Sequence, residues 1–301
     1  ILLAILAAIA RNGQPQTSLP AQPVEGKLFG KTRIVALGLL GLYGAIALWL
    51  LPIHIAWEKS SDGFNAIQQE EPDYDRFVSK LTEAQALVPW EPYYPYQLGW
   101  NLGNLALQTA DPERRATYVK EAIDWFKQGN EVSPYQEFGR SNLAWLYLGQ
   151  QEPAKAMAEF TQSARLLPAK RGVFFGLGLS LLEQEQFPSA VQAIAIEILR
   201  DPQFITSPIW RAGGLVQLYP AVASQVMQDY QQLIEQFPDD ALLHQCRGAI
   251  AWWIGDAALA EAEFTKYGTP EALSLLQPSS TTEQKGRSPS YEPHGKTQNN
   301  A

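Results

Sequence analysis

The chain has 301 residues, of which 46% are apolar and 18% are charged, and its formal net charge is −8 at pH 7. No basic cluster stands after residue 57 that would neutralise the phosphates of a nucleic acid, so we expect no nucleic acid partner. Lone Cys246 excludes an internal disulfide, and the three histidines are too scattered to share a helix face as ligands. We therefore expect no metal site and no cofactor.

The chain opens on ten apolar residues, ILLAILAAIA, without an initiating Met. Two interpretations fit them. Ala8-Ile9-Ala10 resembles a signal-peptidase site, but the positively charged leader of a signal peptide is absent. Ten apolar residues are also too few to span a bilayer. The favoured interpretation is that residues 1–10 are the end of a truncated transmembrane helix.

A stretch of about 24 residues from Ile34 to Trp57 carries no formal charge. At a rise of about 1.5 Å per residue it is long enough to cross a hydrocarbon core of about 30 Å, so we predict a transmembrane helix over residues 34–57. Gly38, Gly41 and Gly44 repeat along it. They suit either the close approach of another helix or the ordinary abundance of Gly in membrane helices.

Charges on either side of this stretch predict its orientation. Residues 11–33 contain Arg11, Lys27, Lys31 and Arg33 against one acidic residue, whereas the segment after Trp57 is mainly acidic. Cytoplasmic loops hold such a basic excess. We therefore expect 11–33 to be a cytoplasmic loop, and the part after the helix to lie outside the cytoplasm, at a bacterial plasma membrane.

A repeat organises the next two hundred residues. Pro134, Pro168 and Pro202 are 34 residues apart, and Ala122, Ala156 and Ala190 keep the same interval. A fixed period of this length is typical of helical arrays, in which each unit buries its apolar face only against its neighbours. The sequence therefore predicts an all-α solenoid over residues 64–276.

The clearest unit contains two helices. Leu143, Ala144 and Tyr147 share a face of the first, Ala156 and Phe160 share a face of the second, and Pro153 starts the second. The next unit has the same offsets: Leu177, Gly178, Leu181, Ala190, Ile194 and Pro202.

The flanking units are less regular. In the preceding unit, seven extra residues before Ala122 are expected to loop out and to end where Asp111 and Pro112 start a helix. Downstream, Gly213-Gly214 stand in the place of a leading pair, and Gly248 opens another unit. Phe77 and Leu81 suggest a lone second helix upstream. Thr269 is expected to cap a short closing helix, and residues 277–301 lack apolar residues to bury and are expected to be disordered.

This pattern of Leu-Ala or Leu-Gly, Tyr, Ala, Phe, small residue and Pro resembles the tetratricopeptide repeat over about residues 75–270. The chain departs from that family at Ser163, which stands where Ala is usual, and in lacking the leading Trp of most units. The resemblance implies that the first helices line a concave surface that binds peptides or other chains.

The arrangement of parts resembles the C-terminal end of a bacterial O-antigen ligase or polymerase-like membrane protein. Cyanobacterial members, some described as inorganic carbon transporters, often carry such repeats. That resemblance implies a role in glycan assembly, with the catalytic Arg and His residues in upstream loops, and none can be placed in this sequence. The alternative is a membrane-tethered interaction scaffold without catalysis.

Two sets of residues are candidates for binding. Phe138, Ser141 and Trp145 form a stripe opposite the packing face of their helix, and Phe175 and Leu179 take the same places in the next unit. The stripe would suit a partner helix, an extended peptide or a sugar ring, unless a neighbouring helix covers it. The second set is the aromatic cluster, expected either at the membrane or glycan surface or as a seal on the end of the solenoid: Trp90, Tyr93, Tyr94, Tyr96 and Trp100.

Overall fold

The structure, a computed structural model, describes residues 27–211 and 213–275. The predicted truncated helix at 1–10, most of the predicted loop at 11–33 and the predicted tail at 277–301 lie outside the described residues. The chain divides into two compact units, residues 1–58 and residues 59–301.

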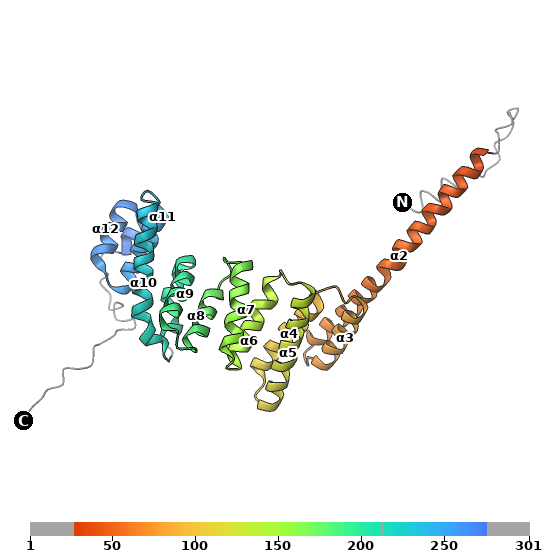
Figure 1. Cartoon of the computed structure of the whole chain (residues 1–301), viewed down its shortest axis with the longest axis horizontal. Helices are drawn as coiled ribbons and strands as arrows, with labels where there is room; N and C mark the ends of the chain where they lie inside the picture. Colours follow the sequence, from red (N-terminus) through yellow and green to blue (C-terminus); the bar gives the residue numbers. More distant parts are fainter. Residues whose placement is uncertain (1–26, 212, 276–301) are drawn as a thin grey trace, which may run out of the picture. The chain divides into compact units, whose positions relative to one another are not determined.

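Within the described ranges every regular element is a helix, and no strand occurs. They are α-helices and two short 3-10 helices (η), and Figure 1 labels the helices α2 to α12. Their bounds are α2 Lys27–Ile67, α3 Tyr74–Leu87, α4 Tyr93–Gln108, α5 Pro112–Val132, α6 Glu137–Gly149, α7 Pro153–Leu166, α8 Val173–Leu182, α9 Phe187–Arg200, η1 Pro202–Thr206, η2 Pro208–Arg211, α10 Leu215–Gln236, α11 Ala241–Ile254, α12 Ala257–Tyr267 and α13 Pro270–Leu275.

Helix α2 is longer than its apolar stretch. It begins at Lys27 and ends at Ile67, so it extends past both ends of the predicted span at 34–57. Hydropathy marks where the side chains become polar, but the backbone hydrogen bonds continue through the charged residues on either side. Among the described helices α2 alone is long and apolar enough to cross a membrane by length and composition, and its most apolar stretch has no buried residue.

The last turns of α2 belong to the second unit and pair with α3. The rings of Phe64 and Phe77 meet edge to face, with centroids 5.3 Å apart. A Cβ on Gly63 would lie 2.7 Å from Leu81, so glycine permits this close approach. The prediction that α3 is a lone second helix was therefore wrong. The sequence did not indicate its partner, the end of α2, because this segment continues an apolar helix and has no repeat pattern of its own.

The two clear units form the predicted helical hairpins, α6 with α7 and α8 with α9, and successive hairpins pack on one another (Figure 1). Ala144, Ala156, Phe160, Ala190 and Ile194 are all fully buried, as their register predicted. The tetratricopeptide-repeat-like α-solenoid is confirmed.

Glycines on one helix make room for bulky side chains of another. A Cβ on Gly176 of α8 would lie 2.2 Å from Cζ of Phe160 in α7, and one on Gly178 would lie 2.4 Å from Ile194. Such distances are well inside van der Waals contact. The missing methyl groups therefore set how closely neighbouring helices approach.

We expect Gly176→Ala to destabilise the repeat domain by about 1–3 kcal/mol through overpacking against Phe160. This loss should exceed the gain of about 1 kcal/mol that Ala normally brings to a helix interior. Gly149→Ala is the matched control, because nothing lies within 4 Å of the added Cβ. Urea unfolding measures both, and an equal change in the two variants would contradict this account of the packing.

The seven additional residues before Ala122 do not loop out, which corrects the prediction. Helix α5 has 21 residues, whereas its counterparts α7 and α9 have 14 each, so the additional length is helical. The predicted helix start is correct, since the Asp111 carboxylate accepts a hydrogen bond from the Glu113 backbone N–H at 2.9 Å. The polar residues that follow can extend a solvent-exposed helix as readily as a loop.

The unit after α9 lacks a first α-helix, which also corrects the prediction for Gly213-Gly214. The 3-10 helices η1 and η2 take that place, and Gly214 instead caps the start of α10. Pro202 and Pro208 interrupt the α-helical hydrogen bonds here. Trp210 fills the space, 1% exposed, with its indole N–H donating to the Phe204 carbonyl at 2.9 Å.

The last predicted unit forms the hairpin of α11 and α12. Gly248 packs on Phe264, whose ring would lie 2.7 Å from an added Cβ. Thr269 accepts a hydrogen bond from the backbone N–H of Ala272 at 3.3 Å and so caps α13, as expected.

Candidate partner-binding surface

The predicted stripe separates into buried and accessible side chains. Ser141 is 4% exposed and Phe175 is 5% exposed, so neither presents more than a trace of surface. Trp145 is 39% exposed, and Phe138 and Leu179 are half-buried. The accessible part of the stripe is therefore centred on Trp145.

Trp145 is held firmly although its surface is open. Its ring meets Phe160 edge to face with centroids 5.0 Å apart, and it lies 6.4 Å from the ring of Phe175 in the next hairpin. A Cβ added to Gly172, the residue before α8, would lie 3.9 Å from the same indole, in ordinary van der Waals contact. An aromatic ring fixed in this way loses little conformational entropy when a ligand stacks on it.

The predicted aromatic cluster also divides. Tyr94 and Tyr96 are buried at 5% and 3% exposure, whereas Trp90, Tyr93 and Trp100 are exposed. Tyr93 packs on Tyr94 and on Phe64 at the end of α2, with centroids 5.5 Å and 6.4 Å away. These rings therefore cover the first hairpin of the repeat domain, formed by the end of α2 and α3.

Trp100 joins the stripe. Its ring lies 5.8 Å from that of Phe138, so the first helices α4 and α6 bring together residues that the sequence placed in separate sets. We call Trp100, Phe138, Trp145 and Leu179 the first-helix aromatic surface. Aromatic faces of this kind suit apolar side chains or sugar rings.

Tyr96 is buried beneath this surface and packs against Phe138, with ring centroids 5.9 Å apart. Its ring packs directly against Gly129 and Gly139. A Cβ added to either glycine would lie 2.4 Å or 2.3 Å from the ring, so only glycine leaves room for it. Its hydroxyl donates to Asn130 Oδ1 or to the Ser133 carbonyl, at 3.2 Å and 3.3 Å. Burial raises the pKa of Tyr96 to about 12, against a smaller opposing effect of Arg140.

We expect the repeat domain to lose stability above about pH 10. Burial raises the pKa of both Tyr96 and Tyr219 to about 12, whereas an unfolded tyrosine ionises near pH 10. The tyrosines of the unfolded chain therefore ionise first. The contribution of Tyr96 and Tyr219 to the free energy of unfolding is complete below pH 10 and is lost as the pH rises towards 12. Urea midpoints between pH 8.5 and 11.5 measure the fall. Tyr96→Phe should make it shallower, and an unchanged pH dependence in that variant would contradict the assignment.

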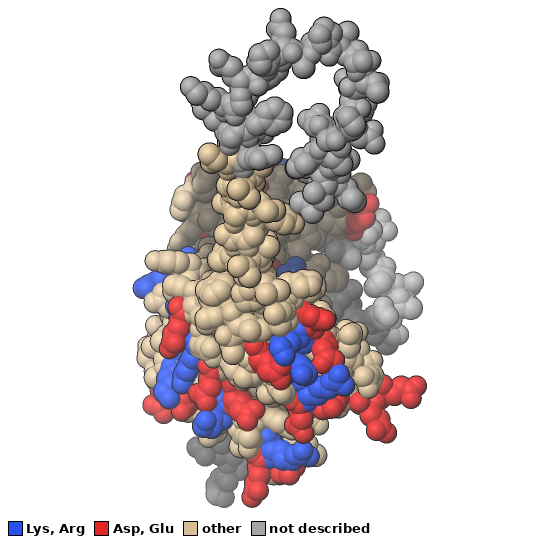
Figure 2. Space-filling view, turned by 90° about the vertical axis from the view of Figure 1, so that its right-hand side faces the viewer, with Lys and Arg blue, Asp and Glu red and all other residues tan. Residues whose placement is uncertain are grey.

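The charges on one face of the repeat domain do not favour an ionic ligand there. Basic and acidic side chains are interspersed on the face shown in Figure 2, without a field of one sign. Several charged side chains of the repeat domain pair with one another, such as Arg140 with Glu159 at 3.0 Å. Among the described residues, no group of three His, Cys, Asp or Glu side chains could hold a metal ion.

The sequence did not indicate a groove between α9 and α10. It has a volume of about 510 Å³ and lies between second helices, away from the predicted stripe. The one available signal was composition, because α10 has six glutamines and no Lys or Arg among its 22 residues.

Comparison with known proteins gives similarity of structure alone. No protein-family model matches the chain, and no curated protein matches it. A segment of MamA from Desulfovibrio magneticus RS-1 is 15% identical, covering 75% of this chain and 97% of that one, with a TM-score of 0.42. A tetratricopeptide repeat protein from Parabacteroides merdae is 18% identical, covering 72% and 81%, with a TM-score of 0.44. A thermophilic repeat protein from Thermus thermophilus is 18% identical, covering 62% and 94%, with a TM-score of 0.39. The assignment of the repeat rests on the register and packing described above.

Proposed function

We propose that the chain is a membrane-anchored repeat protein that binds another protein, or the acceptor in glycan assembly, through its first-helix aromatic surface. The observation that carries this proposal is the pair Trp100 and Trp145, which are 44% and 39% exposed although both are packed against neighbouring rings. Helical arrays of this kind use extended surfaces to bind other chains. Rigid, half-exposed Trp is a frequent centre of binding energy.

Photocrosslinking tests the binding proposal. Benzoylphenylalanine placed at Trp100 or Trp145 should give the same discrete adduct in cells, because both positions face one partner. Tyr135 is the matched control, since this aromatic residue is 86% exposed in the turn between α5 and α6. Equal adducts from all three positions would indicate nonspecific contact and would remove the proposal.

The membrane part of the proposal rests on α2. Its residues from Ile34 onwards expose large apolar side chains, such as Leu37 at 68% and Leu48 at 72%, which is costly in water. The basic residues before this stretch support an orientation with the repeat domain outside the cytoplasm, at a bacterial plasma membrane. A reporter fused after residue 276 tests the orientation. A signal from a reporter that works only in the cytoplasm would reverse it.

The finer proposal is that the repeat domain serves an O-antigen ligase or polymerase-like protein, whose chemistry takes place in upstream helices. Its support is the order of parts: an apolar segment, a basic loop, a long apolar helix and a repeat domain. The sequence encoded upstream tests it. Further apolar runs of about 20 residues, with a polar loop containing Arg and His, would support the ligase proposal. A start codon immediately upstream would leave the scaffold alternative.

A further inference from the structure

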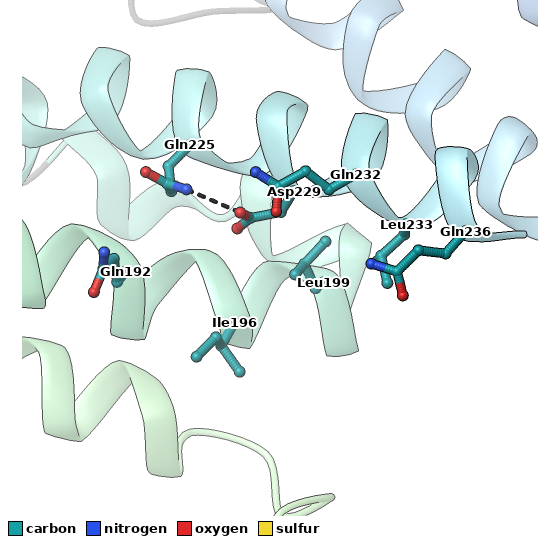
Figure 3. A pocket seen from close by; sticks show the side chains of 8 residues that line it. All are labelled: Gln192, Ile196, Leu199, Gln225, Asp229, Gln232, Leu233 and Gln236. Carbon is teal, nitrogen blue, oxygen red and sulfur yellow. Dashed lines mark hydrogen bonds between the residues drawn. The ribbon is translucent and has the colours of Figure 1, made fainter.

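The groove between α9 and α10 is lined by amide side chains over an aliphatic floor (Figure 3). Ile196 and Leu199 of α9 and Leu233 of α10 supply the apolar part, and Ile196 is 42% exposed. Four glutamines surround them, one from α9 and three from α10: Gln192, Gln225, Gln232 and Gln236.

Charge restricts what this groove can bind. Asp229 is the only charged residue among the eight that line it, and no Lys or Arg is present. Gln225 donates from Nε2 to Asp229 Oδ1 at 2.8 Å and so orients the carboxylate. The groove therefore disfavours anionic ligands and favours a neutral or basic one. It also lacks an aromatic face on which a sugar ring would stack.

The spacing of the polar groups matches an extended polypeptide. On one side of α10, Gln225 and Asp229 are four residues apart, and so are Gln232 and Gln236, which corresponds to a rise of about 6 Å within each pair. In an extended chain every second residue faces the same way, with a repeat of about 6.6 Å. A glutamine amide offers both a donor and an acceptor, as a peptide unit does.

We propose that this groove binds an extended segment of another protein, neutral or basic, with aliphatic side chains at alternate positions. Main-chain N–H and C=O groups of the segment pair with the glutamines. Its aliphatic side chains cover Ile196 and Leu233, and a Lys or Arg pairs with Asp229. This site lies on second helices and is independent of the first-helix aromatic surface, so either proposal can fail alone.

Selection from a displayed library of random decapeptides against the full chain in nanodiscs tests this site. We expect selected peptides to alternate aliphatic with polar or basic residues. Binding of fluorescein-labelled peptides, followed by anisotropy, should weaken about tenfold in Gln225→Ala/Gln236→Ala and in Ile196→Glu. Gln217→Ala is the matched control on the same helix, outside the groove. It should bind as the wild type does.

Two further measurements complete the test. Asp229→Asn should weaken the lysine-containing peptides and leave neutral ones unchanged, because only the former pair with the carboxylate. All of these side chains lie at the surface or only partly inside it, so circular dichroism should confirm folded variants. Selected peptides that bind the groove variants as tightly as the wild type would overturn the proposal. Binding of maltoheptaose in the groove, without binding of any peptide, would overturn it as well.

Discussion

Replacing Glu197 with Ala should cost the repeat domain about 3–5 kcal/mol, because it leaves buried polar groups without their partner. Glu197 lies in α9 and is 2% exposed. Its carboxylate accepts hydrogen bonds from the backbone N–H groups of Gly172, Phe174 and Phe175 at 2.9, 3.1 and 3.2 Å. It therefore caps α8 from the second helix of the hairpin, and it also pairs with Arg200.

Urea unfolding and hydrogen exchange together test this role. The exchange of α8 amides should accelerate most at the start of that helix, where the N–H groups lose their acceptor. Glu197→Gln should fall between the wild type and Glu197→Ala, since the amide oxygen keeps one acceptor but loses the charge. Glu183→Ala is the control, because Glu183 is exposed at the C-terminal end of α8. This variant should change the free energy of unfolding by under about 0.5 kcal/mol. A loss of similar size in both Ala variants would show that Glu197 is not the cap.

Ala156→Trp should unfold its hairpin, with a loss of at least about 3 kcal/mol, because a fully buried helix crossing has no room for an indole. Ala156 packs in the same core cluster as Ala144 and Phe160. Ala158→Trp provides the control, since Ala158 is exposed on the same helix. Thermal unfolding followed by circular dichroism measures both. An unchanged midpoint in Ala156→Trp would refute the assigned repeat register.

The regular hairpins could be predicted because their small and bulky residues recur at fixed offsets. Ala156 and Ala190 are buried where that register placed them. Glu197 could not be predicted in the same way, although it stands 34 residues after Ser163. Both are polar residues at a position that usually holds Ala, and only the folded hairpins show that they bond to different groups: Ser163 to Glu137, and Glu197 to the backbone of α8.

The candidate site was predicted less well for a related reason. Trp145 and Phe175 belong to the same predicted stripe, yet Trp145 is open and Phe175 is buried. The ring of Phe204 in η1 packs on Phe175 with centroids 4.9 Å apart, and Trp210 in η2 packs on Phe204. These rings come from the segment that departs from the repeat. A periodic pattern predicts what repeating neighbours cover, but it cannot predict what an irregular neighbour covers.

The seven additional residues of α5 have a consequence for how this array can change over evolution. Seven residues rotate an α-helix to within about 20° of two complete turns, so the buried face of α5 still points towards its neighbours. An insertion of five residues would turn that face by well over a right angle. Residues 112–117, at the start of α5, are all exposed. Insertions of seven can therefore lengthen one helix into solvent without disturbing the hairpins on either side, and new surface can arise there while the rest of the array keeps its partners.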